Sequence, residues 1–183
     1  FPAIYVQTHE EDRCLESLKT VVGARSVWRW SSPSTGWKPI GANPATPFLQ
    51  PIKTESPIKA IEALASEQAP DDSLFCCLDF HHYLGSPAVS RAIRDALPTL
   101  KAKRRTLVFI SPVLAVPAEL DKEVTVIPFD LPTRAALGAL LDRAVKDATA
   151  DGKAPDVSAR DPILASAAGL TEAEAESAFA LAL

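Results

Sequence analysis

Five short apolar runs, separated from one another by helical or loop-like stretches, most constrain what this chain can fold into. They are Ala3–Gln7, Ser26–Trp30, Leu74–Phe80, Thr106–Ile110 and Val124–Phe129. Each is rich in Val, Ile, Phe or Trp, and several are apolar on both faces. That pattern is typical of strands in a parallel sheet that is covered by helices on both sides.

Stretches with apolar residues at helical spacing lie between these runs, at Glu10–Val22, Ile58–Ser66 and Pro87–Leu97. The last of them has Ser86 as a candidate N-cap and Pro87 at the first helical position. A short turn of helix is expected over Pro117–Lys122. Strands that alternate with helices predict an α/β fold, here a three-layer sandwich with a five-stranded, mainly parallel sheet.

The sheet pattern stops after Asp130, and three helices are predicted beyond it. They span Thr133–Ala150, Arg160–Gly169 and Thr171–Leu183, with a linker at Asp151–Asp156. The letters TEAE at Thr171–Glu174 match a capping box, in which the threonine and the second glutamate cap each other's backbone N–H groups. We therefore predict an α/β domain over residues 1–131 and a small helical subdomain over residues 132–183.

The stretch Ser31–Pro57 differs from its surroundings because it holds six prolines and two glycines. It predicts a long loop, with a hairpin as a possible part of it, and loops of this length are often functional. Trp28 and Trp30 share one strand face and are expected in the core or half-buried. Trp37 lies in the loop and is the better candidate for contact with a partner.

Composition restricts the classes of function. The chain has 183 residues, of which 47% are hydrophobic, so it can fill a real core. Its net charge of −4 gives no electrostatic footprint for nucleic acid or an acidic membrane. Three cysteines do not make a disulfide framework and suit a reducing cytosol. Because the chain begins at Phe1 and contains no methionine, we expect a fragment of a longer protein.

The turn after the first strand lacks the features of a phosphate site. Nucleotide-binding α/β folds place a glycine-rich loop here, whose N–H groups cradle phosphate. This chain has THEED, Thr8–Asp12, with no glycine and no lysine. Thr8 and Glu11 have the spacing of a capping box, and the three acidic residues would repel a nucleotide. We predict a helix start that caps itself and binds no phosphate.

The stretch LFCCLDFHHYL, residues 74–84, concentrates residues that could bind metal. Neighbours on a strand point to opposite faces, so Cys76 and Cys77 cannot readily join one tetrahedral site. The alternation predicts Cys76, Leu78 and Phe80 on one face and Phe75, Cys77 and Asp79 on the other. Only Cys14 and His9 remain as distant further ligands. We expect no metal, and we expect both cysteines to be small buried hydrophobic residues.

Asp79 follows a central strand, at the edge where open α/β sheets place their ligands. With no phosphate loop, its expected role is to accept hydrogen bonds from a helix start or a neighbouring loop. His81 and His82 are expected in the loop that follows, and Ser111 at the tip of the fourth strand. The alternative is a small metal- or ligand-binding enzyme module that uses Asp79, His81 and His82 together with His9.

One basic cluster stands out in the sequence, made of Lys101, Lys103, Arg104 and Arg105. It lies between a predicted helix and the fourth strand, at the opposite edge from the strand tips. We interpret it as a solvated turn. Binding of nucleic acid through this cluster is a weaker alternative, because the chain is acidic and the cluster is short.

Several segments together resemble a known family. In order, they are AIYVQTHEEDRCLESL, VWRWSSPSTGW, LFCCLDFHHYL, RTLVFISPVLAVPAELDKEVTVIPFDLP and AAGLTEAEAESAFALAL. They are similar to the N-terminal region of the AAA+ ATPases called ycf-forty-six in plastids and cyanobacteria. The likeness covers nearly all of the chain except the proline-rich loop and the linker near Asp151–Asp156.

The resemblance implies a RecA/AAA-like domain that has lost its phosphate loop and has no catalytic residues of its own. It also implies a complete AAA+ module after it, which would bind ATP and Mg²⁺, and a full-length protein that forms a ring homo-oligomer. The setting would be a bacterial cytosol or a plastid stroma. The partners would be the protein's own AAA+ module and a protein client. The candidate binding surface is then Thr8, His9, Trp37, Asp79, His81, His82 and Ser111.

Overall fold

The computed structural model describes residues 1–32, 36–41, 51–152 and 157–183. They form two compact units, Phe1–Phe129 and Asp130–Leu183. Each has a hydrophobic core of its own. None of the helices in the described ranges is both long and apolar enough to cross a membrane.

The first unit contains a sheet to which the described residues contribute seven strands. These are β1 (Ala3–Gln7), β2 (Ser26–Ser31), β3 (Gly36–Pro39), β4 (Ile52–Lys53), β5 (Ser73–Leu78), β6 (Thr106–Ser111) and β7 (Thr125–Pro128). Their order across the sheet is β4-β3-β2-β5-β6-β1-β7. The five predicted strands are confirmed and are parallel to one another. The predicted strand number is wrong, because β3 and β4 add an antiparallel hairpin at one edge.

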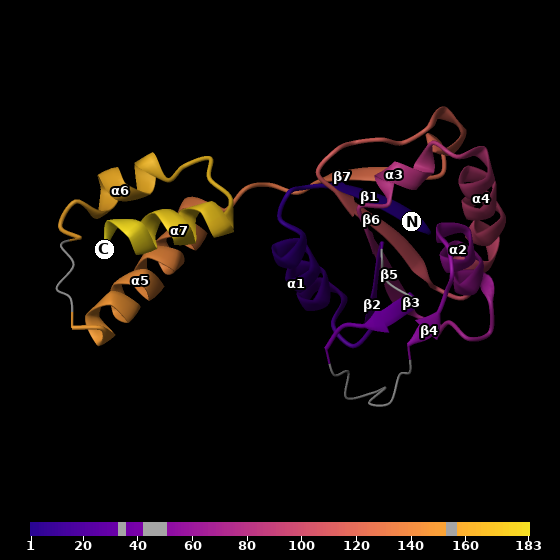
Figure 1. The fold of residues 1–183 in the computed structure, drawn as a ribbon, viewed down its shortest axis with the longest axis horizontal. Helices are drawn as coiled ribbons and strands as arrows, with labels where there is room; N and C mark the ends of the chain where they lie inside the picture. Colours follow the sequence, from indigo (N-terminus) through magenta and orange to yellow (C-terminus); the bar gives the residue numbers. More distant parts are fainter. Residues whose placement is uncertain (33–35, 42–50, 153–156) are drawn as a thin grey trace. The chain divides into compact units, whose positions relative to one another are not determined.

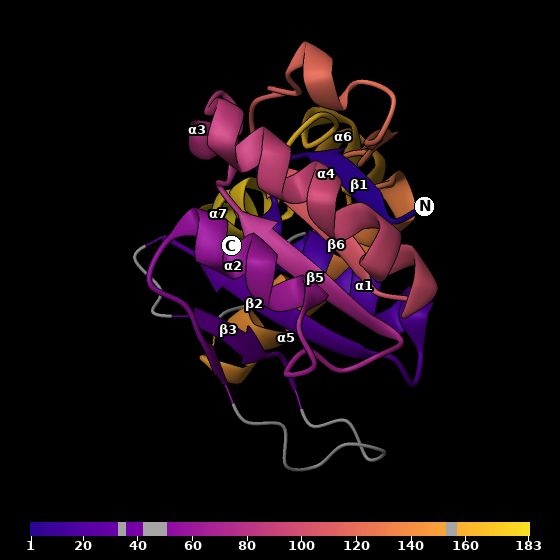
Figure 2. The same cartoon turned by 90° about the vertical axis from the view of Figure 1, so that its right-hand side faces the viewer.

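Helices cover both faces of this sheet. They are α1 (Glu11–Val22), α2 (Pro57–Ala65), α3 (His81–Leu84), α4 (Pro87–Ala102) and the single-turn η1 (Ala118–Leu120). Figures 1 and 2 show α1 on one face and α2 with α4 on the other. Ser86 stands at the N-cap of α4 but its side chain makes no capping hydrogen bond.

Each face of the sheet has its own hydrophobic core, and the two adjacent cysteines are divided between them. Cys76 packs with Cys14 in the core under α1, and Cys77 lies in the larger core under α2 and α4. The prediction that the two thiols are buried on opposite faces is confirmed. Phe80 was expected beside Cys76 but lies in the larger core. The strand ends at Leu78, and Asp79 has a left-handed backbone with φ 53°, so the alternation stops before Phe80.

Burial makes all three thiols unreactive in the folded chain. Cys14 is 1% exposed and Cys76 and Cys77 are 0% exposed. Burial raises the pKa of Cys14 to about 11 and holds the pKa values of Cys76 and Cys77 well above their ordinary range. Since the thiolate is the nucleophile, we expect no rapid reaction with Ellman's reagent in native buffer and release of all three thiols in denaturant. One thiol that reacts within seconds in native buffer would contradict this burial.

The proline-rich stretch contains the β3–β4 hairpin in its described part, while residues 33–35 and 42–50 lie outside the described residues. The hairpin needs glycine at position 36. A Cβ there would stand 2.1 Å from the carbonyl oxygen of Ile52, and the φ of Gly36 is +153°. The hairpin brings Trp37 into the core rather than to the surface. Trp37 is 0% exposed and its indole N–H donates to the carbonyl of Ala60.

The basic cluster is only in part the solvated turn that its sequence suggested. Lys103, which is partly buried, pairs with the exposed Glu67, and the exposed Arg104 pairs with Asp72. Arg105 is buried, with 2% of its surface exposed. Its guanidinium donates to Asp71 and to four carbonyl oxygens, which belong to Leu64, Ser66, Ala69 and Pro70. Arg105 therefore fixes the segment that joins α2 to β5.

The second unit consists of α5 (Arg134–Ala150), α6 (Arg160–Ser166) and α7 (Glu172–Ala182). Their start signals are confirmed: the Thr133 hydroxyl accepts from the N–H of Ala136, and Thr171 forms the predicted capping box with Glu174. The core of this unit is built mainly from Leu137, Leu140, Leu141, Leu164, Ala175 and Phe179. Of the predicted linker at Asp151–Asp156, residues 153–156 lie outside the described residues.

Candidate functional site

Parallel strands bring their carboxyl ends to one edge of the sheet, and most of the predicted site residues gather there. In the register, Gln7 is opposite Ser111 in β6, and Leu78 is opposite Ile110. Thr8 and Asp79, which follow Gln7 and Leu78, therefore flank the tip of β6. The N–H of Thr8 donates to the carbonyl of Ser111 at 2.9 Å, and that of Asp79 to the carbonyl of Ile110 at 3.1 Å.

The turn from β1 to α1 is short and closed by its own side chain. Thr8 is buried, and its hydroxyl accepts a hydrogen bond from the N–H of Glu10 at 3.0 Å. The helix begins at Glu11 with Glu10 as N-cap, and Glu10 makes no side-chain capping bond. The predicted capping box between Thr8 and Glu11 is therefore wrong in detail. The hydroxyl still occupies a backbone N–H that a phosphate loop would offer to its ligand.

The electrostatics of this turn oppose an anion. Burial raises the pKa of Glu11 above its ordinary value, Asp79 and Asp12 raise it further, and Arg29 offsets part of the effect. Glu10 is engaged by Arg13, whose guanidinium also lies 4.3 Å from the centre of the Phe129 ring. Carboxylates thus stand where a phosphate group would have to lie.

Replacing Glu11 with Gln should change how stability depends on pH. The folded state holds the Glu11 proton more tightly than the unfolded state does. Ionisation of this carboxyl therefore destabilises the folded state once the pH rises above 4.5, the ordinary pKa of a glutamate. Below that pH the penalty disappears. Relative to the native chain, Glu11→Gln should therefore be more stable at pH 7 than it is below pH 4, as measured by urea unfolding at both. Glu119→Gln on the exposed turn η1 is the matched control, and an equal pH dependence in both variants would contradict the expectation.

Asp79, His81 and Ser111 come together at the tips of β5 and β6. Nδ1 of His81 lies 3.1 Å from the Ser111 hydroxyl and 3.9 Å from a carboxylate oxygen of Asp79. The two histidines lie in the one-turn helix α3 rather than in the predicted loop, and their ring centres are 3.9 Å apart. Ser111 is fully buried, whereas the side chain of Asp79 is 55% exposed.

These three residue types form catalytic triads in other folds, but the geometry here does not fit one. A triad places the serine on one ring nitrogen of histidine and the carboxylate on the other. In this chain both groups approach the same nitrogen, Nδ1, and the hydroxyl has no exposed surface. What the contact does is join α3 to the tip of β6.

The remaining predicted site residues are His9, His82 and Trp37, and they differ in burial. His9 and His82 are exposed at the same edge of the sheet. Trp37 is removed from the candidate surface because it is buried in the core against Phe75. Within the part of the chain that the structure describes, no group of three or more His, Cys, Asp or Glu side chains could hold a metal ion.

Sequence reasoning missed two residues that shape this edge. Tyr5 donates its hydroxyl to the carbonyl of Val113, and Gln7 donates its amide to the carbonyl of Pro112. Together they attach the loop after β6 to strand β1. A tyrosine and a glutamine in a strand carry no sequence signal for such contacts, because the acceptors are carbonyls more than a hundred residues away.

Fold and site together define a mostly parallel α/β domain whose first strand-to-helix turn has no glycine and is closed by a threonine. Within this broad class of α/β domains, the comparison of sequences identifies a particular family. The sequence profile of the SpoVK-like AAA ATPase N-terminal domain matches residues 1–129, and the chain belongs to this family.

The relatives agree with the resemblance found in the sequence. The chain is 26% identical to the AAA domain-containing protein ycf46 of Trieres chinensis over 79% of its own length and 28% of that protein. It is 27% identical to ycf46 of Guillardia theta over 72% of its length and 25% of that protein. The chain therefore spans about a quarter of the length of these curated relatives. The expected likeness to the N-terminal region of ycf-forty-six proteins is confirmed.

A solved structure shows a similar fold. A chain from work on the structural basis for katanin self-assembly superposes with a TM-score of 0.53 and 17% sequence identity. The match covers 96% of this chain and 55% of the katanin chain. At this level of identity the likeness concerns the fold alone.

Proposed function

We propose that this chain is a non-catalytic, partner-binding N-terminal domain of a longer AAA+ ATPase. The observation that carries the proposal is the closed turn from β1 to α1. There the Thr8 hydroxyl occupies the N–H of Glu10, and burial and Asp79 raise the pKa of Glu11. A sheet with this turn keeps the scaffold of an ATPase, but the N–H of Glu10 is taken by Thr8 and carboxylates crowd the helix start, which disfavours a nucleotide.

The finer assignment is a degenerate RecA/AAA-like domain followed by a lid-like helical unit. Its support is the fold shared with the katanin chain and the order of helices after β7. In the full-length protein, ATP and Mg²⁺ would bind in the following AAA+ module, and that module would assemble the protein into a ring. The setting we propose is a bacterial cytosol or a plastid stroma, as for the family.

A protein is a better partner for this domain than nucleic acid. The chain carries a net charge of −4. Within its one basic cluster, Arg105 is buried in backbone contacts, while Lys103 and Arg104 are paired with carboxylates. These cations are not arranged as a stripe that could follow a phosphate backbone. The surface proposed for the partner is the sheet edge with His9, Asp79 and His82. His81, which contacts Ser111 and Asp79, lies at the same edge.

Calorimetric titration tests the proposal. The 183-residue chain should release no heat above dilution when ATP and Mg²⁺ are added at millimolar concentration, whereas the full-length protein should bind. Micromolar binding to the chain alone would overturn the proposal. The gene is also expected to encode a glycine-rich loop ending in GKS or GKT downstream of this domain, and its absence would count equally against it.

A further inference from the structure

Three exposed basic side chains lie on one face of the sheet, on the neighbouring strands β2, β3 and β4. They are Arg29, Lys38 and Lys53. Their neighbours along the strands, Trp28, Trp37 and Ile52, belong to the core under α2 and α4. Because successive side chains in a strand point to opposite faces, the three cations lie on the face against which α1 packs. We call this set the basic face.

The pairing of the strands brings these like charges together. Arg29 and Lys38 stand directly opposite each other in the β2–β3 pair. Side chains at such positions have Cβ atoms about 5 Å apart, and like charges there destabilise a sheet. Lys53 is opposite Gly36, which places it diagonally next to Lys38 on the same face. The basic face therefore costs stability, and the fold by itself gains nothing from it.

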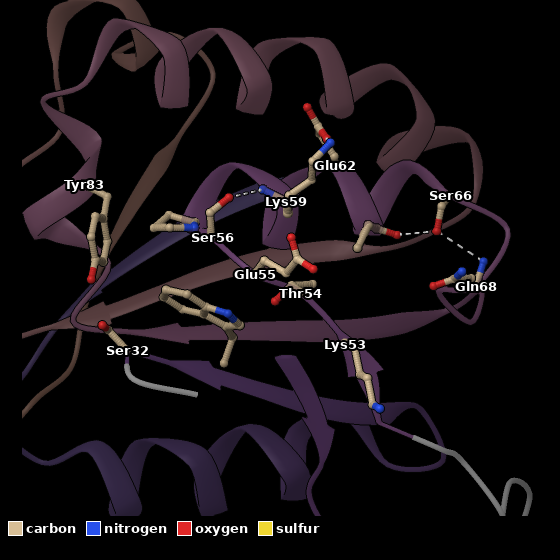
Figure 3. A pocket seen from close by; sticks show the side chains of 13 residues that line it. Ser32, Lys53, Thr54, Glu55, Ser56, Lys59, Glu62, Ser66, Gln68 and Tyr83 are labelled. Carbon is tan, nitrogen blue, oxygen red and sulfur yellow. Dashed lines mark hydrogen bonds and ion pairs between the residues drawn. The ribbon is translucent and has the colours of Figure 1, made fainter. Parts of the chain in front are cut away.

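Helix α1 leaves the basic face open. The buried core under α1 takes residues from β1, β2, β5 and β6, and among the described residues it takes none from β3 or β4. Lys53 also borders a pocket beside α2, which Trp30, Thr54 and Tyr83 line (Figure 3). In Figure 3 its side chain points away from Glu55 of that pocket. The charge of Lys53 is therefore available to a partner on the basic face.

The described residues place no carboxylate within ion-pair distance of the basic face. Arg29, Lys38 and Lys53 form no salt bridge with them. Arg29 does offset part of the rise that burial causes in the pKa of Glu11, so one of the three charges is partly balanced. Residues 31–54, which connect β2 to β4, contain no aspartate or glutamate. The carboxylates that would balance the basic face have to come from another molecule.

The basic face suits a short acidic stretch of protein better than a nucleic acid. Neighbouring strands are about 4.8 Å apart, so three strands span about 10 Å. Every second side chain of an extended peptide lies about 7 Å further along, so two or three carboxylates match this width. A nucleic acid would continue beyond it with further phosphates, which the net charge of −4 repels.

We propose that the basic face binds an acidic segment of a protein partner. Carboxylates of the segment pair with Arg29, Lys38 and Lys53, which removes the repulsion between Arg29 and Lys38. This inference deepens the proposed function and rests on it, since it names the chemistry of the partner that a partner-binding domain would hold.

The test measures the fluorescence anisotropy of a fluorescein-labelled decaglutamate peptide as the 183-residue chain is added. At about 0.1 M salt, charges more than about 10 Å away are screened. We expect binding by the native chain and at least tenfold weaker binding by the double variant Lys38→Glu, Lys53→Glu. The matched control is Lys101→Glu, Lys122→Glu, at exposed positions outside β2–β4. It changes the net charge equally and should bind like the native chain.

Unfolding in urea separates a loss of binding from a loss of structure. Lys38→Glu places opposite charges across β2 and β3, so its urea midpoint should equal or exceed that of the native chain. A lower midpoint would contradict the repulsion on which the proposal depends.

A ten-residue thymidine oligonucleotide, labelled in the same way, distinguishes carboxylates from phosphates and should bind more weakly than decaglutamate. The proposal is overturned if the native chain does not bind decaglutamate, if the two double variants bind it equally, or if the oligonucleotide binds as tightly. These results leave the proposed function standing, which nucleotide binding by the chain alone would remove.

Discussion

Arg105→Ala should lower the free energy of unfolding by about 3–5 kcal/mol, because each buried acceptor left without its donor costs about 1–3 kcal/mol and the guanidinium of the buried Arg105 serves several. The substitution leaves four carbonyl oxygens without their donor, at the end of α2 and in the segment before β5. Such a loss is a large share of the roughly 5–15 kcal/mol that stabilises an ordinary domain. Urea unfolding followed by far-ultraviolet circular dichroism measures it.

The neighbouring arginine is the matched control. Arg104 is 76% exposed at its side chain and pairs with Asp72 at 3.0 Å, so Arg104→Ala should cost no more than about 1 kcal/mol. Arg105→Lys tests the geometry, since an ammonium group cannot reach all of the acceptors that the planar guanidinium reaches. We expect the free energy of unfolding of Arg105→Lys to be much closer to that of Arg105→Ala than to that of the native chain. Equal stability of the two alanine variants would show that Arg105 is not the anchor described.

Trp37→Ala should destabilise the first unit by about 3–5 kcal/mol, as truncation of a buried aromatic residue does. Trp37 packs edge-on against Phe75 with ring centres 5.3 Å apart, and its N–H donates to the carbonyl of Ala60 at 2.9 Å. The side chain therefore holds the β3–β4 hairpin to both the sheet and α2. Circular dichroism is the suitable probe, since the substitution removes one of the three tryptophans.

Trp37→Phe separates packing from hydrogen bonding. It keeps an aromatic ring against Phe75 and loses the donor to Ala60, so a smaller loss of about 1–2 kcal/mol is expected. The prediction from sequence, that Trp37 is a surface contact for a partner, implies the opposite result. If Trp37→Ala changed stability by less than about 1 kcal/mol, as surface substitutions do, that earlier interpretation would be restored.

The candidate site was predictable in its location and much less so in its contacts. Parallel strands end at a common edge, so the positions after β1, β5 and β6 had to meet there, and Thr8, Asp79 and Ser111 do. The approach of His81 to Ser111 could not be foreseen, because it depends on a one-turn helix that follows a left-handed residue. The pocket that Trp30, Thr54 and Tyr83 line had no sequence signal, since hydroxyl residues are ordinary in loops.

The sequence by itself determined the five parallel strands, the helices between them and the three helices that follow. It also determined the family, because periodicity, caps and motifs are local properties of the chain. Only the tertiary structure decided which polar and aromatic side chains are buried. Trp37 lies in the core, Arg105 is enclosed by carbonyls, and the buried Thr54 hydroxyl has no hydrogen-bond partner among the described residues. Burial depends on contacts between segments distant in the chain, and no local pattern records those contacts.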